Sequence, residues 1–167
     1  QPHDELDPLG TGLTDQLLET VELTANRYTA AKPQYFGEVV ILRNGTAFYE
    51  NLRDTLIRLT AANQLIDLLI LTHGGVNSIA LAQGTHVTGE QIRAIRAHNG
   101  GRPVRLRTVY MMNCQGRSLN DAWIALGAKA SVGSHATNYL PEPTTFFFFR
   151  NWKAGQSFND AVTNAYR

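Results

Sequence analysis

The chain has 167 residues, a length that suits one domain of ordinary size with a buried core. Its 43% hydrophobic and 17% charged content is that of a globular protein, and its net charge of +1, without a run of Lys or Arg, indicates no surface for nucleic acid or membranes. Cys114 is the single cysteine, which excludes an intrachain disulfide and a cysteine-rich zinc site.

The N-terminal segment is polar and starts at Gln1 rather than at a methionine. It has no basic-then-apolar signal pattern, so we expect a processed or excised piece of something longer, in a compartment that the sequence does not identify. No apolar stretch approaches the ~20 residues of a membrane-spanning helix.

Apolar periodicity and turn residues predict an alternation of helices and strands along the chain. Thr88 and Gln91 form a capping-box pattern, Ser118 is the predicted N-cap of the helix that follows it, and Gly127 is the predicted C-cap of the same helix. The predicted elements are a helix over 13–31, a strand over 36–42, a helix over 51–64, a strand over 65–72, a hairpin over 78–89, a helix over 90–98, a strand over 104–112, a helix over 117–127, a strand over 128–134, and helices over 144–154 and 157–166.

Strands that are apolar on both faces and alternate with helices predict an α/β fold with a mostly parallel sheet. Helices on each side would make it a three-layer α/β/α sandwich, and we expect one domain over 1–167, with the N-terminal helix followed by a core over 36–167. Such folds bind ligands beyond the carboxyl ends of their strands. His73 ends the strand in "LILTHGG", and Cys114 ends the strand in "VYMMNCQGRSL". If these two strands are neighbours, one substrate carbonyl can reach both side chains.

The surroundings of Cys114 suit a nucleophile, which must react as a thiolate. The helix expected to begin near Ser118 would present free N–H groups and partial positive charge to the sulfur. Gly116 lets the backbone turn closely, and Gly74 leaves room for N–H groups that point at a carbonyl oxygen. His73 would then protonate the leaving amine and activate water. Each residue alone also fits a structural role, His73 as a backbone-bonded strand end and Cys114 as packing under a helix.

The two motifs together resemble the caspase-like cysteine peptidases of the caspase–haemoglobinase fold (clan CD). In caspases the cysteine is followed by Arg, Gln or Gly and then by Gly, with a histidine about 50 residues earlier. Cys114-Gln115-Gly116 is similar to this pattern, and His73 precedes Cys114 by 41 residues. Met112 and Asn113 depart from the Gln-Ala that precedes the cysteine in caspases. The order of elements over 123–162 looks most like a bacterial CHAT domain.

This resemblance implies a cysteine endopeptidase with His73 as general acid/base and Cys114 as nucleophile. It implies that backbone N–H groups at Gly74 and Cys114 stabilise the oxyanion, and that no cofactor is required. The implied partners are a peptide or protein substrate and, in addition, flanking domains or a regulatory partner.

The resemblance also implies a specificity pocket for the residue before the scissile bond, walled in part by the loop over 133–143. Asp121 and Glu142 are candidates for selecting a basic residue, and Arg117 for the reverse, although each also fits a solvated surface charge. His135 lies on the same loop. We slightly favour a preference for basic residues.

Other features of the sequence bear on alternatives to a caspase-like peptidase. Class I amidotransferases place Gly two residues before the cysteine and a histidine far downstream, whereas position 112 is Met. An inactive caspase-like binding or scaffold module remains the alternative, because fold does not dictate function. His3, His86 and His98 show no metal-ligand spacing, so no metal site is expected.

The four consecutive phenylalanines at 146–149 cannot share one face, so at least one is expected outside the main packing contact.

Overall fold

The computed structural model describes residues 36–138 and 143–166. The chain forms two compact units. We call residues 40–138 the core unit, and residues 36–39 with 143–166 the helical unit. The helix predicted over 13–31 lies outside the described residues, and the single domain over 1–167 stays a prediction.

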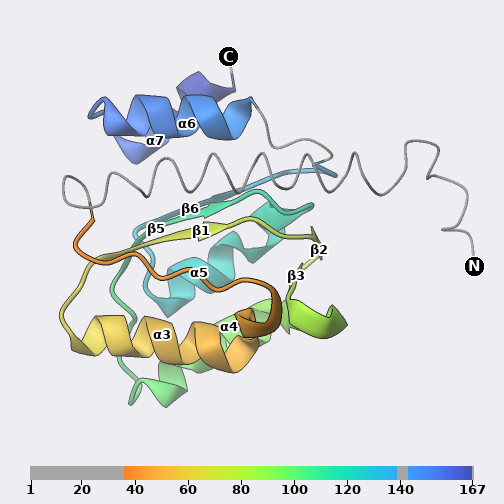
Figure 1. Cartoon of the computed structure of the whole chain (residues 1–167), viewed down its shortest axis with the longest axis vertical. Helices are drawn as coiled ribbons and strands as arrows, with labels where there is room; N and C mark the ends of the chain where they lie inside the picture. The colour runs from red at the N-terminus through yellow and green to blue at the C-terminus, as the bar shows by residue number, and fades with distance from the viewer. Residues whose placement is uncertain (1–35, 139–142, 167) are drawn as a thin grey trace, which may run out of the picture. The chain divides into compact units, whose positions relative to one another are not determined.

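The helices and strands predicted between residues 51 and 134 all have counterparts in the core unit (Figure 1). Its elements are η1 (Asn44–Thr46), α3 (Tyr49–Ala61), β1 (Ile66–Ile70), β2 (Gly74–Gly75), β3 (Ser78–Ala80), η2 (Ala82–Gly84), β4 (His86–Thr88), α4 (Gly89–His98), β5 (Leu106–Met111), η3 (Gly116–Leu119), α5 (Asn120–Leu126) and β6 (Ala130–Gly133). The two-residue strand β2 had no signal in the sequence, since two glycines carry no strand preference.

The main sheet has the order β1-β5-β6, and both of its pairings are parallel. A second, antiparallel sheet has the order β2-β3-β4. The predicted α/β class with a mostly parallel sheet is therefore confirmed for the core unit. The sheet places the residues that follow β1 and β5 at one edge, which is where the sequence motifs lie.

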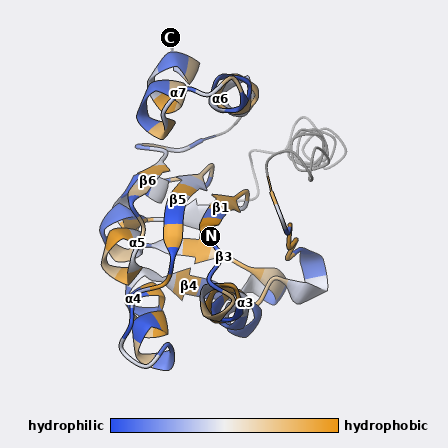
Figure 2. Cartoon of the chain, turned by 90° about the vertical axis from the view of Figure 1, so that its left-hand side faces the viewer, coloured by the Kyte–Doolittle hydropathy of each residue, from blue (hydrophilic) through white to orange (hydrophobic). Residues whose placement is uncertain are grey.

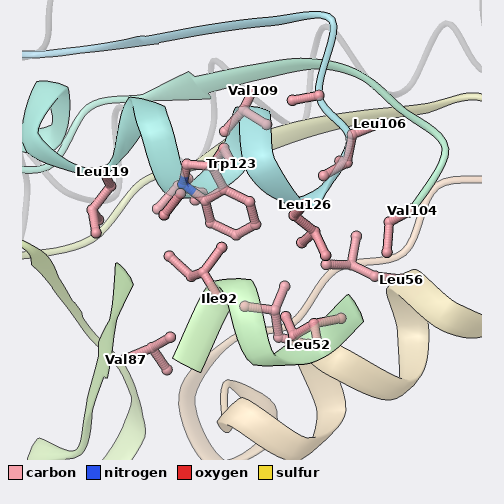
Figure 3. Packing of buried hydrophobic residues seen from close by; sticks show 14 of the residues in the cluster. Leu52, Leu56, Val87, Ile92, Val104, Leu106, Val109, Leu119, Trp123 and Leu126 are labelled. Carbon is pink, nitrogen blue, oxygen red and sulfur yellow. The ribbon is translucent and has the colours of Figure 1, made fainter. Parts of the chain in front are cut away.

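The hydrophobic core lies between the main sheet and helices α3, α4 and α5, which lie on the same face of that sheet (Figures 1 and 2). Trp123 of α5 is 0% exposed and lies among Val109, Ile92 and Leu126 (Figure 3). Burying a side chain of this size removes a large apolar area from water, worth about 1.5–3 kcal/mol for each large apolar residue. This packing fixes helix α5 against the main sheet.

The start of helix α4 follows the predicted capping box. The Gln91 N–H donates to Thr88 Oγ1 at 3.4 Å, and the Thr88 N–H donates to Gln91 Oε1 at 2.9 Å. Gly127 ends α5 with φ of 137°, as predicted for a C-cap glycine. Both predictions concern local backbone chemistry and are confirmed.

The strand predicted over 36–42 is absent from the described structure, and that prediction was wrong. Val40 is 40% exposed and Ile41 is 53% exposed, although the apolar pattern predicted burial. Apolar residues favour a strand only where they fit a half-buried pleated surface, and this segment does not supply one.

Ser118 is not the N-cap of α5, contrary to the prediction. A short 3-10 helix covers Gly116–Leu119, and α5 begins only at Asn120, with Leu119 as its N-cap. The helix α5 therefore begins six residues after Cys114 in sequence, and the contribution of its N-terminus to the thiolate stays a prediction. Gln115, with φ of 55°, makes the turn that directly follows the cysteine.

The helical unit contains α6 (Thr144–Lys153) and α7 (Phe158–Ala165), in agreement with the prediction. Phe148 is 1% exposed and stacks on Trp152 with ring centroids 5.5 Å apart. Phe146 is 44% exposed, which confirms that the four phenylalanines do not share one packing face.

Candidate active site

The parallel pairing of β1 with β5 means that His73 and Cys114 follow the carboxyl ends of adjacent strands. Ile70 pairs with Met111 at the end of the ladder, and the Met112 N–H donates to Ile70 O at 2.9 Å. His73 lies three residues after Ile70, and Cys114 lies three residues after Met111. Neighbouring strands lie about 4.7–4.9 Å apart, so the two residues belong to adjacent strand ends.

The backbone of His73 is held by the small antiparallel sheet. The Ala80 N–H donates to His73 O at 2.8 Å, and Thr72 Oγ1 donates to Ala80 O at 2.8 Å. The His73 side chain is exposed, and within the described residues its imidazole has no hydrogen-bond or ion-pair partner. The backbone of the histidine is therefore ordered while its ring is open to solvent.

The thiol of Cys114 contacts a neighbouring loop, which we call the strap and define as residues 134–138. The Asn138 N–H donates to Cys114 Sγ at 3.3 Å, and Sγ lies 3.8 Å from Asn138 O. The Gln115 N–H donates to Ala136 O at 3.1 Å, and the Arg117 N–H donates to Ser134 O at 3.0 Å. The strap thus runs along the cysteine loop, which comprises residues 113–118, and forms one wall of the site.

Two backbone N–H groups in the segments that carry His73 and Cys114 have the geometry of free donors. The Cys114 N–H has no acceptor among the described residues. His73 and Ala80 form a hydrogen-bonded pair of their antiparallel ladder, so the following pair, Gly74 and Ile79, is a non-hydrogen-bonded pair. The Gly74 N–H therefore points away from β3.

Asn113 is a buried side chain between the two predicted motifs, and it is 1% exposed. Its Nδ2 donates to Cys114 O at 3.0 Å, while its Oδ1 has no partner within the described part of the chain. A β-carbon on Gly116 would lie 3.0 Å from Asn113 Oδ1, and one on Gly74 would collide with Asn113 Nδ2. Both glycines are needed because the asparagine fills the space next to them.

The predicted specificity residues have different outcomes. His135 is exposed on the strap, next to the segment that contacts Cys114. Asp121 is exposed in the first turn of α5 and has no hydrogen bond or ion pair with any described residue. Glu142 lies outside the described residues. The structure therefore brings the loop of His135 into hydrogen-bonded contact with the cysteine loop, whereas Asp121 forms no hydrogen bond or ion pair with any described residue.

Three groups near the candidate dyad were not predicted as site residues from the sequence: the side chains of Asn113 and Asn138, and the hydroxyl of Ser118. Asn113 left a signal, because a polar amide directly after an apolar strand and before a cysteine is unusual in a buried position. Asn138 and Ser118 left none, since their contacts join residues 24 and 41 positions apart in sequence.

Over residues 36–138 and 143–166, no three His, Cys, Asp or Glu side chains gather as a metal site would require. No helix in the same residues is long and apolar enough to cross a membrane. Comparisons of the chain with protein families, with curated proteins and with solved structures find no match.

Proposed function

We propose that this chain is a cysteine endopeptidase with a His73/Cys114 dyad, of the caspase-like kind and most similar in pattern to bacterial CHAT domains. We further propose that the whole chain forms the three-layer sandwich of the caspase–haemoglobinase fold. The observation that supports this proposal most directly is the pairing of β1 with β5, because His73 and Cys114 each follow the last residue pair of these adjacent parallel strands by three residues.

In the proposed reaction, the Cys114 thiolate attacks the carbonyl carbon of the scissile peptide bond and forms a C–S bond. The carbonyl π electrons move to oxygen and give a tetrahedral oxyanion. When the intermediate collapses, the C–N bond breaks and the His73 imidazolium transfers its proton to the departing amine. A water molecule, deprotonated by His73, then hydrolyses the thioester and returns Cys114 to its starting state.

The oxyanion would be stabilised by the N–H groups of Cys114 and Gly74. The first has no acceptor among the described residues, and the second points away from its ladder partner. Donors placed in advance at the developing charge contribute strongly to such reactions, about 2.7–4 kcal/mol for each donor removed in a known case. Gly74 has no side chain to obstruct the approach of the substrate.

The substrate class in this proposal is a peptide or protein, and the chemistry uses only side chains and backbone groups of the chain. The strap, with His135 exposed on it, would line the pocket for the residue before the scissile bond. The proposal includes a preference for a basic residue before the scissile bond, with Asp121 and Glu142 as the candidates that would select it.

One observation favours the second candidate, an inactive caspase-like module. The sulfur of Cys114 is hydrogen-bonded to the strap at Asn138, and within the described residues His73 makes no bond to it. A latent enzyme or a scaffold would show the same contact.

Intact-mass measurement of the full chain after incubation with peptidyl electrophiles tests the proposal. The panel carries Arg, Lys, Asp, Asn or Gly at the recognition position, and the single cysteine makes any adduct easy to assign. Wild type is compared with Cys114→Ala, His73→Ala and His98→Ala, with circular dichroism to verify folding. His98→Ala is the matched control, because His98 is also an exposed histidine of the core unit but lies at the end of α4, outside the proposed site.

An active peptidase gives one adduct on wild type that is lost in Cys114→Ala, forms much more slowly in His73→Ala and forms at the wild-type rate in His98→Ala. The recognition residue that reacts fastest reports the specificity. The absence of an adduct with every probe, in folded protein, would reject the peptidase and leave the inactive module.

A further inference from the structure

Ser118 connects the two segments that carry the proposed dyad. Its Oγ accepts the Asn77 N–H at 2.7 Å and donates to Gln115 O at 2.6 Å. Asn77 lies in the turn of the β2–β3 hairpin, and Gln115 directly follows Cys114. One hydroxyl therefore joins two loops that are 41 residues apart in sequence.

The hairpin side of this connection leads directly to His73. The turn residue Asn77 has φ of 56°, and its carbonyl accepts the Gly89 N–H at 3.2 Å at the start of α4. From this turn, the β2–β3 ladder runs back through Gly75 and Gly74 to the hydrogen bond between His73 O and the Ala80 N–H. A displacement of the hairpin tip would be transmitted to the histidine.

The cysteine side is equally short. Gln115 adopts a left-handed conformation with φ of 55°, and its carbonyl receives both the Ser118 hydroxyl and the Ser118 N–H, the latter at 2.9 Å. This carbonyl belongs to the peptide unit between Gln115 and Gly116, so the two bonds hold the turn that directly follows the nucleophile. The strap binds the opposite edge of the same residue through the Gln115 N–H.

We propose that Ser118 is a positioning residue, which holds the His73 hairpin against the Cys114 loop at the separation that lets the imidazole reach the thiol. This inference rests on the proposed function, since it assumes that the two residues form a dyad. Ser118 is exposed and contributes little apolar packing, so its substitution removes the connection without opening a cavity.

The rate of Cys114 alkylation by iodoacetamide tests this role, measured by intact mass of the full chain across a range of pH. The variants are Ser118→Ala, His73→Ala and the double variant. Ser118→Thr and Ser118→Val are added as a pair, because threonine and valine have nearly the same shape and only threonine carries a hydroxyl. Thr85→Ala is the matched control, because the exposed Thr85 hydroxyl donates only to the nearby Ala82 O, at 2.8 Å. Arg117 on the cysteine loop, His135 on the strap and His73 on the hairpin are the ionisable side chains of the segments around the thiol. His98→Ala is a second control, because His98 is exposed at the end of α4 and lies outside these segments.

We expect Ser118→Ala to slow alkylation at pH 6.5 about fivefold, the size expected for one lost neutral hydrogen bond, and to move the rate profile to higher pH. Ser118→Thr, Thr85→Ala and His98→Ala should behave as wild type, and Ser118→Val should behave as Ser118→Ala. The double variant should be no slower than His73→Ala, because both changes remove one interaction.

An unchanged profile in both Ser118→Ala and Ser118→Val would overturn the inference, and so would a slowing that adds fully to that of His73→Ala. If His73→Ala also has no effect on the profile, the proposed dyad itself fails. If His73→Ala acts and the Ser118 variants do not, only the positioning role fails.

Discussion

Gly74 packs against Asn113 so closely that a β-carbon at position 74 would collide with the asparagine Nδ2 and lie 2.9 Å from Ser78 O. The residue after His73 is thus in direct contact with the residue before Cys114. The segment that contains His73 and Gly74 therefore packs against the segment that contains Asn113 and Cys114, and the asparagine leaves no room for a side chain at position 74.

Replacing Gly74 by Ala should destabilise the core unit by about 1–3 kcal/mol, the usual cost of adding a carbon to a filled site. Asn113 is buried and bonded to Cys114 O, so it cannot yield without moving the nucleophile. Urea unfolding of the full chain measures the change, and the alkylation rate of Cys114 should fall as well. Gly45→Ala is the control, since nothing lies within 4 Å of a β-carbon there. Equal stability of the two variants would contradict the packing described.

Removing the capping box of α4 should lower the free energy of unfolding by about 1 kcal/mol. In Thr88→Ala, the Gln91 N–H loses its acceptor at the start of the helix. Thr88→Ser keeps the hydroxyl and should remain close to wild type in urea unfolding. A loss in Thr88→Ser as large as that in Thr88→Ala would attribute the effect to the methyl group and not to the cap.

Tyr49 should make the protein less stable at alkaline pH. Burial raises the pKa of its phenol above the ordinary value of 10.0, against an opposing effect of Arg53. The unfolded chain therefore loses this proton first, so the contribution of Tyr49 is complete below pH 10 and decreases as the pH rises toward the folded pKa. Tyr49→Phe should weaken the alkaline decline.

The same substitution should also cost about 1 kcal/mol at neutral pH, because Tyr49 Oη donates to Gln91 O at 3.0 Å and joins α3 to α4. Thermal unfolding from pH 7 to 11 measures both effects. If the stability of Tyr49→Phe declined with pH as steeply as that of wild type, another group would be responsible for the alkaline decline.

Loosening the strap should be visible in hydrogen exchange. Asn138 Nδ2 donates to Met112 O at 3.1 Å, which anchors the end of the strap beside the cysteine. In Asn138→Ala we expect faster exchange of the Gln115 and Arg117 amides, which donate to strap carbonyls. Thr137→Ala, an exposed neighbour, is the control. Unaltered protection of both amides would mean that the backbone bonds alone hold the strap.

Local chemistry was sufficient to predict most elements of the core unit. The apolar runs before His73 and before Cys114 became β1 and β5, and the Thr88 and Gln91 pair became the cap of α4. These features depend on residues a few positions apart, so propensity and periodicity report them. The same reasoning failed for 36–42, because a strand needs a partner and a covered face, and neither is encoded within the segment.

The candidate site was predictable only in its two reactive residues. A histidine and a cysteine after two apolar strands suggest a shared sheet edge, but only the pairing of Ile70 with Met111 shows that the two strands are neighbours. Ser118 shows the limit most clearly. Its local sequence predicts an N-cap, whereas its hydroxyl bonds to a hairpin 41 residues away. Backbone propensity acts within one turn or strand, while strand register, burial and long-range hydrogen bonds arise only when distant segments pack together.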